Sequence, residues 1–351
     1  MRLRLMLCCA PMLLAQSLAV LADEPVDAAA AGLAVEPAAE DALPVTLLDA
    51  VEVSGIQPGP GLWRVTDPES GHVLVIVGSH TPVPRRIQWE ASEALGILAG
   101  SGAVIAPARV SVDSGVGRLR GLTMLPSLMR ARRNPGDQAL SEVMPEALYA
   151  RWERLKAEYL GRSRKVERWR PLFAARELFE EALKRARLTD DNPVWPMVRR
   201  EAERLKVPVL RPAVEIKIDA PRELIRDFAQ RTLDDLPCME ATLDLVEHHM
   251  PALRLRADAW AVGAIDLMRG EALPPADQLC LKAMLGAAPE DRDAFADLPG
   301  RVRAAWLETA VQALDEHPQT LAVVSIGWLL DPAGPLQALA DRGYEIQAPA
   351  Q

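Results

Sequence analysis

Two stretches at opposite ends of the chain decide the fold: VLVIVGSHTPVP at residues 73–84 and LAVVSIGWLLDPAGP at residues 321–335. Each begins with a near-continuous apolar run and then breaks into turn residues. Such a run, without alternation, is typical of a strand that is buried on both faces of a sheet. Each run therefore brings the residues that follow it to the carboxyl end of a strand, where sheet proteins usually place their sites.

The residues around the first run predict a hairpin, a helix and a further strand. Leu62 to Thr66 alternates as a strand does, and Asp67 to Gly71 supplies turn residues before the buried strand at His72 to Val77. Trp89 to Leu98 is expected to be a helix, and Ala103 to Ala106 the next strand.

A similar unit closes the chain. Thr320 to Ile326 is the apolar strand, and Asp331 is expected to cap a helix with Pro332 at its first position. Gly343 is expected to end this helix in the left-handed conformation, before a last strand at Tyr344 to Gln347.

The middle of the chain is predicted to be helical. Leu148, Trp152, Leu155 and Tyr159 recur at helical spacing, and Pro171 suits the first position of a second helix. A third helix is expected at 197–205, then short strands at 207–210 and 214–217, then more helices over 221–316. The sequence thus predicts an α/β (α+β) fold. Its mixed central sheet is built from the N- and C-terminal strand units and includes residues 72–78, 103–106 and 320–326, with a large helical region packed over it.

The amino terminus is predicted to be a signal peptide over residues 1–22. Arg2 and Arg4 precede an apolar stretch, and Val20-Leu21-Ala22 ends in small residues that a signal peptidase accepts. An uncleaved membrane anchor is the alternative, although the apolar run is short and broken for a spanning helix. Residues 23–45, rich in Ala, Pro and acidic groups, are expected to be a flexible linker. Residues 46–351 then form a single domain, with a helical insertion at about 140–316.

Export and charge together limit the partners. Cleavage removes Arg2 and Arg4 and changes the formal net charge from −9 to −11. Such an acidic protein is not expected to bind nucleic acid or an anionic membrane surface, and no membrane span is expected after cleavage. We expect a periplasmic or secreted protein. Of its four cysteines only Cys238 and Cys280 remain after cleavage, and they form either a disulfide or two buried thiols.

Several stretches together resemble the TraB/GumN family, which is related to the Tiki-type metalloproteases. The resemblance rests on the two quoted segments, on Leu62-Trp63-Arg64-Val65, on Arg168-Trp169-Arg170-Pro171, on Val214-Glu215, on a helix with Arg301, Arg303 and Trp306, and on Asp341-Arg342-Gly343-Tyr344. It covers most of residues 60–348. In that family each of the two segments reads roughly G-x-x-H, and the resemblance implies two histidines as metal ligands.

This chain departs from the family pattern at three positions. Trp328 stands where the second histidine is expected, and an indole has no lone pair for a cation. In Gly78-Ser79-His80-Thr81 the histidine lies one residue early, and Pro107 stands near an expected acidic residue. A catalytic zinc needs about three protein ligands, so we expect no cofactor, with His80 as a weak candidate ligand. Asp244 and His248 share a helix face and are expected to form a surface hydrogen bond rather than a metal site.

The leading hypothesis is an exported, non-catalytic relative of these metalloproteases that binds a peptide, protein or envelope component, with Trp328 as an apolar contact. One alternative is an active metal-dependent peptidase with a rearranged site of His80, Glu215 and Arg301 or Arg303, holding a divalent metal such as zinc. Another is a purely structural envelope protein. The candidate cleft comprises Gly78, Ser79, His80, Thr81, Glu215, Arg301, Arg303, Gly327 and Trp328.

Overall fold

The two quoted segments form adjacent central strands of one sheet in the computed structural model, which describes residues 56–117, 121, 123–269, 272–286 and 297–349. The predicted signal peptide and linker lie outside these residues. The sheet has six strands in the order β12 (Glu345–Gln347), β2 (Leu62–Thr66), β3 (Val73–Ser79), β11 (Gln319–Ser325), β6 (Ala103–Ile105) and β9 (Val209–Leu210).

Strands β3 and β11 run parallel along their full length, with Val73 opposite Gln319 and Ser79 opposite Ser325. Strand β2 pairs antiparallel with β3, and β12 pairs antiparallel with β2, so the sheet is mixed. The predicted α/β fold class is confirmed, and residues 73–78 and 321–326 lie near each other as expected, since they belong to directly paired strands.

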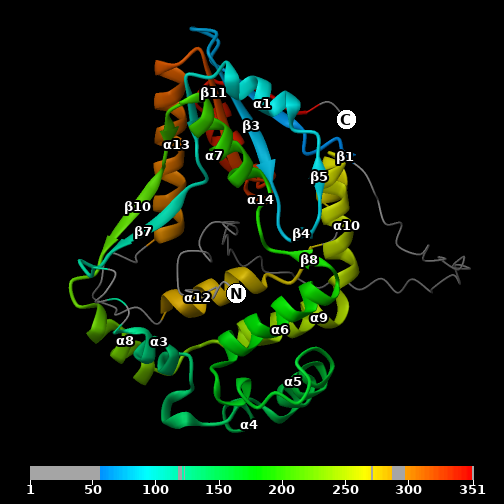
Figure 1. Cartoon of the computed structure of the whole chain (residues 1–351), viewed down its shortest axis with the longest axis vertical. Helices are drawn as coiled ribbons and strands as arrows, with labels where there is room; N and C mark the ends of the chain where they lie inside the picture. The colour runs from blue at the N-terminus through cyan, green and yellow to red at the C-terminus, as the bar shows by residue number, and fades with distance from the viewer. Residues whose placement is uncertain (1–55, 118–120, 122, 270–271, 287–296, 350–351) are drawn as a thin grey trace, which may run out of the picture.

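Three pairs of shorter strands lie outside this sheet. They are β1 (Ile56–Gln57) with β5 (Gln88–Trp89), β4 (Val83–Pro84) with β8 (Leu188–Thr189), and β7 (Arg109–Asp113) with β10 (Ala213–Lys217). The β7–β10 pair is a parallel ribbon that extends away from the sheet (Figure 1). Its strand β7 has no counterpart among the predicted elements.

Helices cover both faces of the central sheet. The chain moves across the sheet in one direction from β3 to β6 and β9, and returns the other way to β11. Right-handed crossovers therefore place α1 (Ser92–Ala99) and α7 (Val194–Leu205) on one face and α13 (Leu298–Glu316) on the other. Figure 1 shows α7 in front of the sheet.

A second group of helices packs around its own apolar core below the carboxyl edge of the sheet in Figure 1. Its buried side chains include Leu140, Trp152, Leu178, Leu188, Met239 and Leu243. The helices that supply this core are α4 (Leu140–Val143), α5 (Glu146–Tyr159), α6 (Pro171–Arg185), α9 (Leu236–His248), α10 (Met250–Ala261) and α12 (Ala276–Gly286). The helical region thus covers the sheet only in part and forms a body beside it.

The remaining helices are short connecting elements. They are α3 (Leu125–Ala131), η1 (Pro135–Asp137), η2 (Val166–Arg168), α8 (Pro221–Gln230), α11 (Ile265–Met268), α14 (Ile326–Leu329) and α15 (Pro335–Ala340). Among the described residues no helix combines the length and the apolar character needed to cross a membrane.

One buried cation joins three of these helices. Arg170 precedes α6 and is 1% exposed. Its guanidinium donates hydrogen bonds to the backbone carbonyls of Ala131, Phe228, Ala229 and Arg231, over distances of 2.8–3.1 Å. These carbonyls lie at the ends of α3 and α8. Burial lowers the pKa of Arg170, and the nearby Asp235 carboxylate opposes this effect.

Two predicted helix starts in the terminal units are wrong, and the helix expected at 197–205 begins three residues earlier, at Val194. Trp89 pairs with Gln57 in a short strand, and the helix begins at Ser92, whose N–H donates to the Glu90 carboxylate. Asp331 does not cap a helix that starts at Pro332. Its carboxylate accepts from the Ala333 N–H and its carbonyl from the Gly334 N–H, so a turn delays the helix until Pro335.

Candidate functional site

The two turn segments lie side by side at the carboxyl edge of the sheet. Because Ser79 is opposite Ser325 in the parallel pair, Gly78 to Thr81 adjoins the start of α14, which carries Gly327 and Trp328. The Ser79 hydroxyl donates to the Val324 carbonyl at 3.2 Å and is buried. The serine therefore fastens one strand end to the other, and its hydroxyl is engaged inside the sheet.

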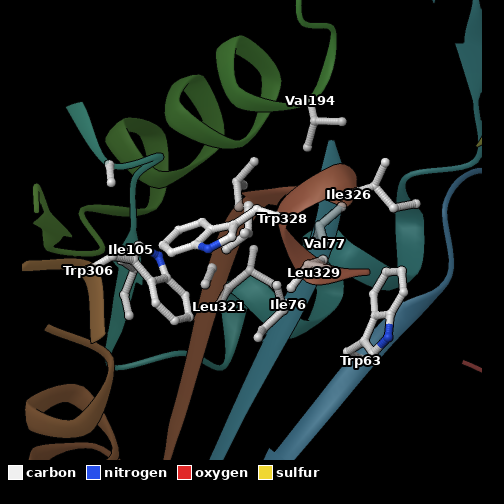
Figure 2. Close-up of a cluster of buried hydrophobic side chains, with 14 of the residues drawn as sticks. Trp63, Ile76, Val77, Ile105, Val194, Trp306, Leu321, Ile326, Trp328 and Leu329 are labelled. Carbon is white, nitrogen blue, oxygen red and sulfur yellow. The ribbon is translucent and has the colours of Figure 1, made fainter. Parts of the chain in front are cut away.

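Trp328 closes the end of β11 as a core side chain. It is 9% exposed, and its ring meets that of Trp306 from α13 edge-on, with centroids 5.3 Å apart and an interplanar angle of 69°. Figure 2 shows the two indoles together in the buried cluster that also contains Ile105 and Leu321. Edge-to-face pairs of this kind add to the stabilisation that burial provides. Little of the indole surface is left for a ligand, while Gly327 beside it is exposed.

His80 is half-buried at the end of β3, and its Nε2 atom is covered without a hydrogen-bond partner in the described part of the chain. Burial, and secondly the positive charge of Arg256, lower the pKa of His80 to about 4. The Trp260 indole N–H donates to the Gly78 carbonyl at 2.8 Å, and this hydrogen bond fixes the end of β3 to α10. The imidazole is therefore neutral near pH 7.

The lowered pKa predicts a pH-dependent contribution to stability. Between about pH 6.5 and 4 the unfolded chain binds a proton at His80 that the folded protein does not. The stability that the protein gains from holding His80 neutral is therefore complete above pH 6.5 and is lost as the pH falls toward 4. We expect the stability of the native protein relative to His80→Gln to fall by on the order of 2 kcal/mol from pH 7 to 4. Urea unfolding at several pH values measures this difference.

The comparison with the variant is essential, because another group acts in the opposite direction. Burial raises the pKa of Asp190 to about 6, so that carboxyl favours the folded state as the pH falls. Its effect is common to both proteins and cancels in the difference. Parallel pH profiles for the two proteins would contradict a depressed histidine pKa.

The other candidate residues are placed less closely. Glu215 lies in the β7–β10 ribbon opposite Ser111 and is exposed, whereas its neighbours Val214 and Ile216 are buried. Arg301 and Arg303 lie in the first turns of α13 and are half-buried. Arg303 precedes Trp306 by three residues and therefore leaves the same side of the helix. The structure thus joins the two turn segments and places Arg303 on the helix that supplies Trp306, whereas Glu215 lies on a separate ribbon.

These side chains do not fit a zinc site. A zinc ion takes its ligands from Cys, His, Asp or Glu, and the edge offers one imidazole, with an indole and a hydroxyl at the neighbouring signature positions. In the ranges that the structure describes, no three His, Cys, Asp or Glu side chains are grouped so that they could hold a metal. No chemical step is therefore assigned to a metal here.

Three residues of this edge were not among the candidates: Trp260, Arg256 and, as a site residue, Trp306. They come from α10 and α13: Trp260 hydrogen-bonds to Gly78, Trp306 packs against Trp328, and the positive charge of Arg256 acts on His80. A tryptophan within a helix reads as an ordinary core residue, so only the fold reveals that two of them border the strand ends.

The geometry defines a mixed α/β protein in which one turn segment from each end of the chain shares an edge of the sheet. A comparison with family models matches residues 61–348 to the TraB/PrgY/gumN family. The protein belongs to this family, and the resemblance seen in the sequence is confirmed. A search of curated proteins found no match, and neither did a search of solved structures.

Proposed function

We propose that the protein is a non-catalytic member of the TraB/PrgY/gumN family that binds a peptide, protein or envelope component at the shared strand edge. The burial of Trp328 against Trp306 carries this proposal. At the position where the resemblance implies a metal-binding histidine, the chain has Trp328, whose indole packs in the hydrophobic core. A hydrolase site that needs a metal-binding histidine at this position therefore lacks that ligand.

The edge retains groups that suit binding. Gly327 is exposed, and His80 and Thr81 are half-buried. Arg303 forms no hydrogen bond or ion pair with any residue that the structure describes. A half-buried guanidinium without a carboxylate partner is suited to an acidic or carbonyl group of a ligand.

A metal-dependent peptidase with a rearranged site is the second candidate, and one observation favours it. A histidine must be neutral to bind a metal, and His80 is neutral near pH 7 with a covered, unpartnered Nε2. In that case Glu215 and Arg301 or Arg303 would have to complete the site.

Metal content separates the two functions. We expect the mature protein, loaded with zinc and dialysed, to retain no stoichiometric metal, and His80→Ala to change nothing. The double variant Trp328→His/Thr81→His offers two imidazoles at the strand ends and should retain more zinc than the native protein. Inductively coupled plasma mass spectrometry measures the bound metal.

Replacing the buried indole costs on the order of a few kcal/mol, so folding is checked by circular dichroism. Trp328→Phe is the matched control, because it disturbs the same packing and adds no ligand. Stoichiometric zinc in the native protein that is lost in His80→Ala would reject the binding function in favour of the peptidase.

We also propose that the protein is exported and that its mature form starts near Asp23. The charged start, the apolar stretch and the ending Val20-Leu21-Ala22 support this. N-terminal sequencing of protein from the periplasmic fraction is expected to begin near Asp23. A cytoplasmic product that begins at Met1 would contradict export.

A further inference from the structure

Three of the five large apolar side chains that the described residues leave exposed belong to α10 and α11, or directly follow α10. Leu255 and Val262 are 56% and 43% exposed, and Leu267 is 53% exposed. Leu255 and Val262 are two helical turns apart, so both side chains leave the same side of α10. Helix α11, which carries Leu267, packs against α10. We call these three residues the α10–α11 face, because grouped apolar side chains mark a contact surface more often than single ones do.

Charge does not select an ionic occupant for this face. Asp258, which lies between the two exposed side chains of α10, already pairs with Arg254 at 3.2 Å. On α9, by contrast, ionisable side chains crowd together. Asp244 lies 3.9 Å from His248, which exceeds hydrogen-bond length, so the hydrogen bond predicted between them is absent. An apolar occupant therefore suits the α10–α11 face best.

The chain enters the described structure beside this face. The described residues begin at Ile56 in β1, and the Gly59 N–H donates to the Ala261 carbonyl, at the end of α10, over 2.8 Å. Figure 1 shows β1 next to the same end of α10. Because Val262 directly follows Ala261, the residues that precede β1 start only a short length of chain away from the face.

The segment before β1 has the composition that the face requires. Residues 46–55, TLLDAVEVSG, contain Leu47, Leu48, Val51 and Val53, whereas the expected linker at 23–45 is rich in Ala, Pro and acidic groups. A segment of this length spans up to about 33 Å when extended. The chain from β1 to α10 takes up about 10 Å of this reach, and the two helical turns of the face take up about 10 Å more. The segment can therefore reach along the whole face.

The small size of the face also favours an occupant from the same chain. A stable complex between separate proteins uses about 20–30 residues on each side, and this face offers three exposed apolar side chains. A contact of this size is weak between separate molecules. It forms more readily within one chain, because a short connection gives an effective concentration on the order of mM.

We propose that residues 46–55 dock on the α10–α11 face as an apolar strap. The strap would brace the side of α10 that lies roughly opposite Trp260, the residue whose indole fixes the end of β3 through the Gly78 carbonyl. This contact does not depend on any activity at the strand edge.

The test is limited proteolysis of the oxidised mature protein, with its Cys238–Cys280 disulfide intact. Thermolysin cleaves before apolar residues, and Leu33 in the expected linker serves as the internal reference. We expect cleavage within residues 46–55 to be at least about tenfold slower than cleavage before Leu33, because cleavage of a docked segment follows the population of its open form. Mass spectrometry of the products measures both rates.

A pair of double variants tests where the segment docks. Leu255→Asp/Val262→Asp puts charge on the face and should raise cleavage within residues 46–55 about tenfold. Val112→Asp/Met129→Asp is the matched control, because these side chains are 53% and 55% exposed and lie on β7 and α3. The control should keep the rate within about twofold of the native rate. Circular dichroism checks that both variants are folded.

Three results would overturn the strap. They are native cleavage within residues 46–55 as fast as cleavage in the linker, protection that survives in the face variant, and equal acceleration by both variants. Analytical ultracentrifugation tests a second copy as the occupant. We expect monomers throughout, and a native dimer that Leu255→Asp/Val262→Asp converts to a monomer would show that the face joins two chains instead.

Discussion

Replacing Arg170 by methionine is expected to lower the free energy of unfolding by about 3–5 kcal/mol, as the removal of one partner from a buried ionic network does. Methionine fills a similar space but donates no hydrogen bond. The carbonyls of Ala131, Phe228, Ala229 and Arg231 would lose their donor at the ends of two helices. Urea unfolding followed by circular dichroism measures the loss.

Arg168→Met is the matched control two residues earlier. The Arg168 side chain is 57% exposed and pairs with Asp137 on the surface, so its loss should cost at most about 1 kcal/mol. Arg170→Lys should remain strongly destabilised, because an ammonium cannot reproduce the planar fork that reaches four carbonyls. A loss for Arg170→Met as small as that of the control would show that the guanidinium is not essential to this junction.

Trp306→Ala is expected to destabilise the protein by a similar amount, about 3–5 kcal/mol, which is typical of a large cavity in a core. Trp306 is fully buried, and its removal leaves Trp328 without its ring partner above β11. The same unfolding measurement applies.

Trp306→Phe tests the reason for this effect. The Trp306 indole N–H has no hydrogen-bond partner in the described part of the chain, so phenylalanine gives up volume but no hydrogen bond. Its loss should be clearly smaller than that of alanine. If alanine and phenylalanine cost the same, the ring contact with Trp328 contributes nothing measurable.

The sequence predicted the central strands because their signal is local. The apolar runs at 73–77 and 321–324 need both faces of a sheet covered, whatever the partners are. The family resemblance implied that both segments lie at one site. The parallel pairing of β3 with β11 brings their turn residues to the same edge of the sheet. Helix starts were harder, because tertiary contacts to Gln57 and a turn at Asp331 override the local signals at Trp89 and Pro332.

The partners of single side chains were beyond the reach of sequence patterns. In the sequence Arg170 resembles an ordinary loop residue. Its hydrogen-bond acceptors are backbone carbonyls 39 to 61 residues away, and because every residue has a carbonyl, no sequence pattern identifies them. Glu215 was correctly assigned to a strand, but the ribbon that removes it from the sheet depends on β7, an element that no clear pattern announces. The two cysteines allowed a bond or two thiols until the packing of α9 on α12 set their distance.

The pairing of β3 with β11 also sets the order in which this protein can fold. The hydrogen bond from Ser79 to Val324 spans 245 residues, and β11 is the last long strand of the chain. Closing so long a loop is costly in entropy and slows folding. While the chain is being synthesised, β3 and β6 have no central neighbour, and their open edges are exposed to other chains. The complete sheet can therefore form only after the carboxyl-terminal strand has been made, because β11 is the strand that joins β3 to β6.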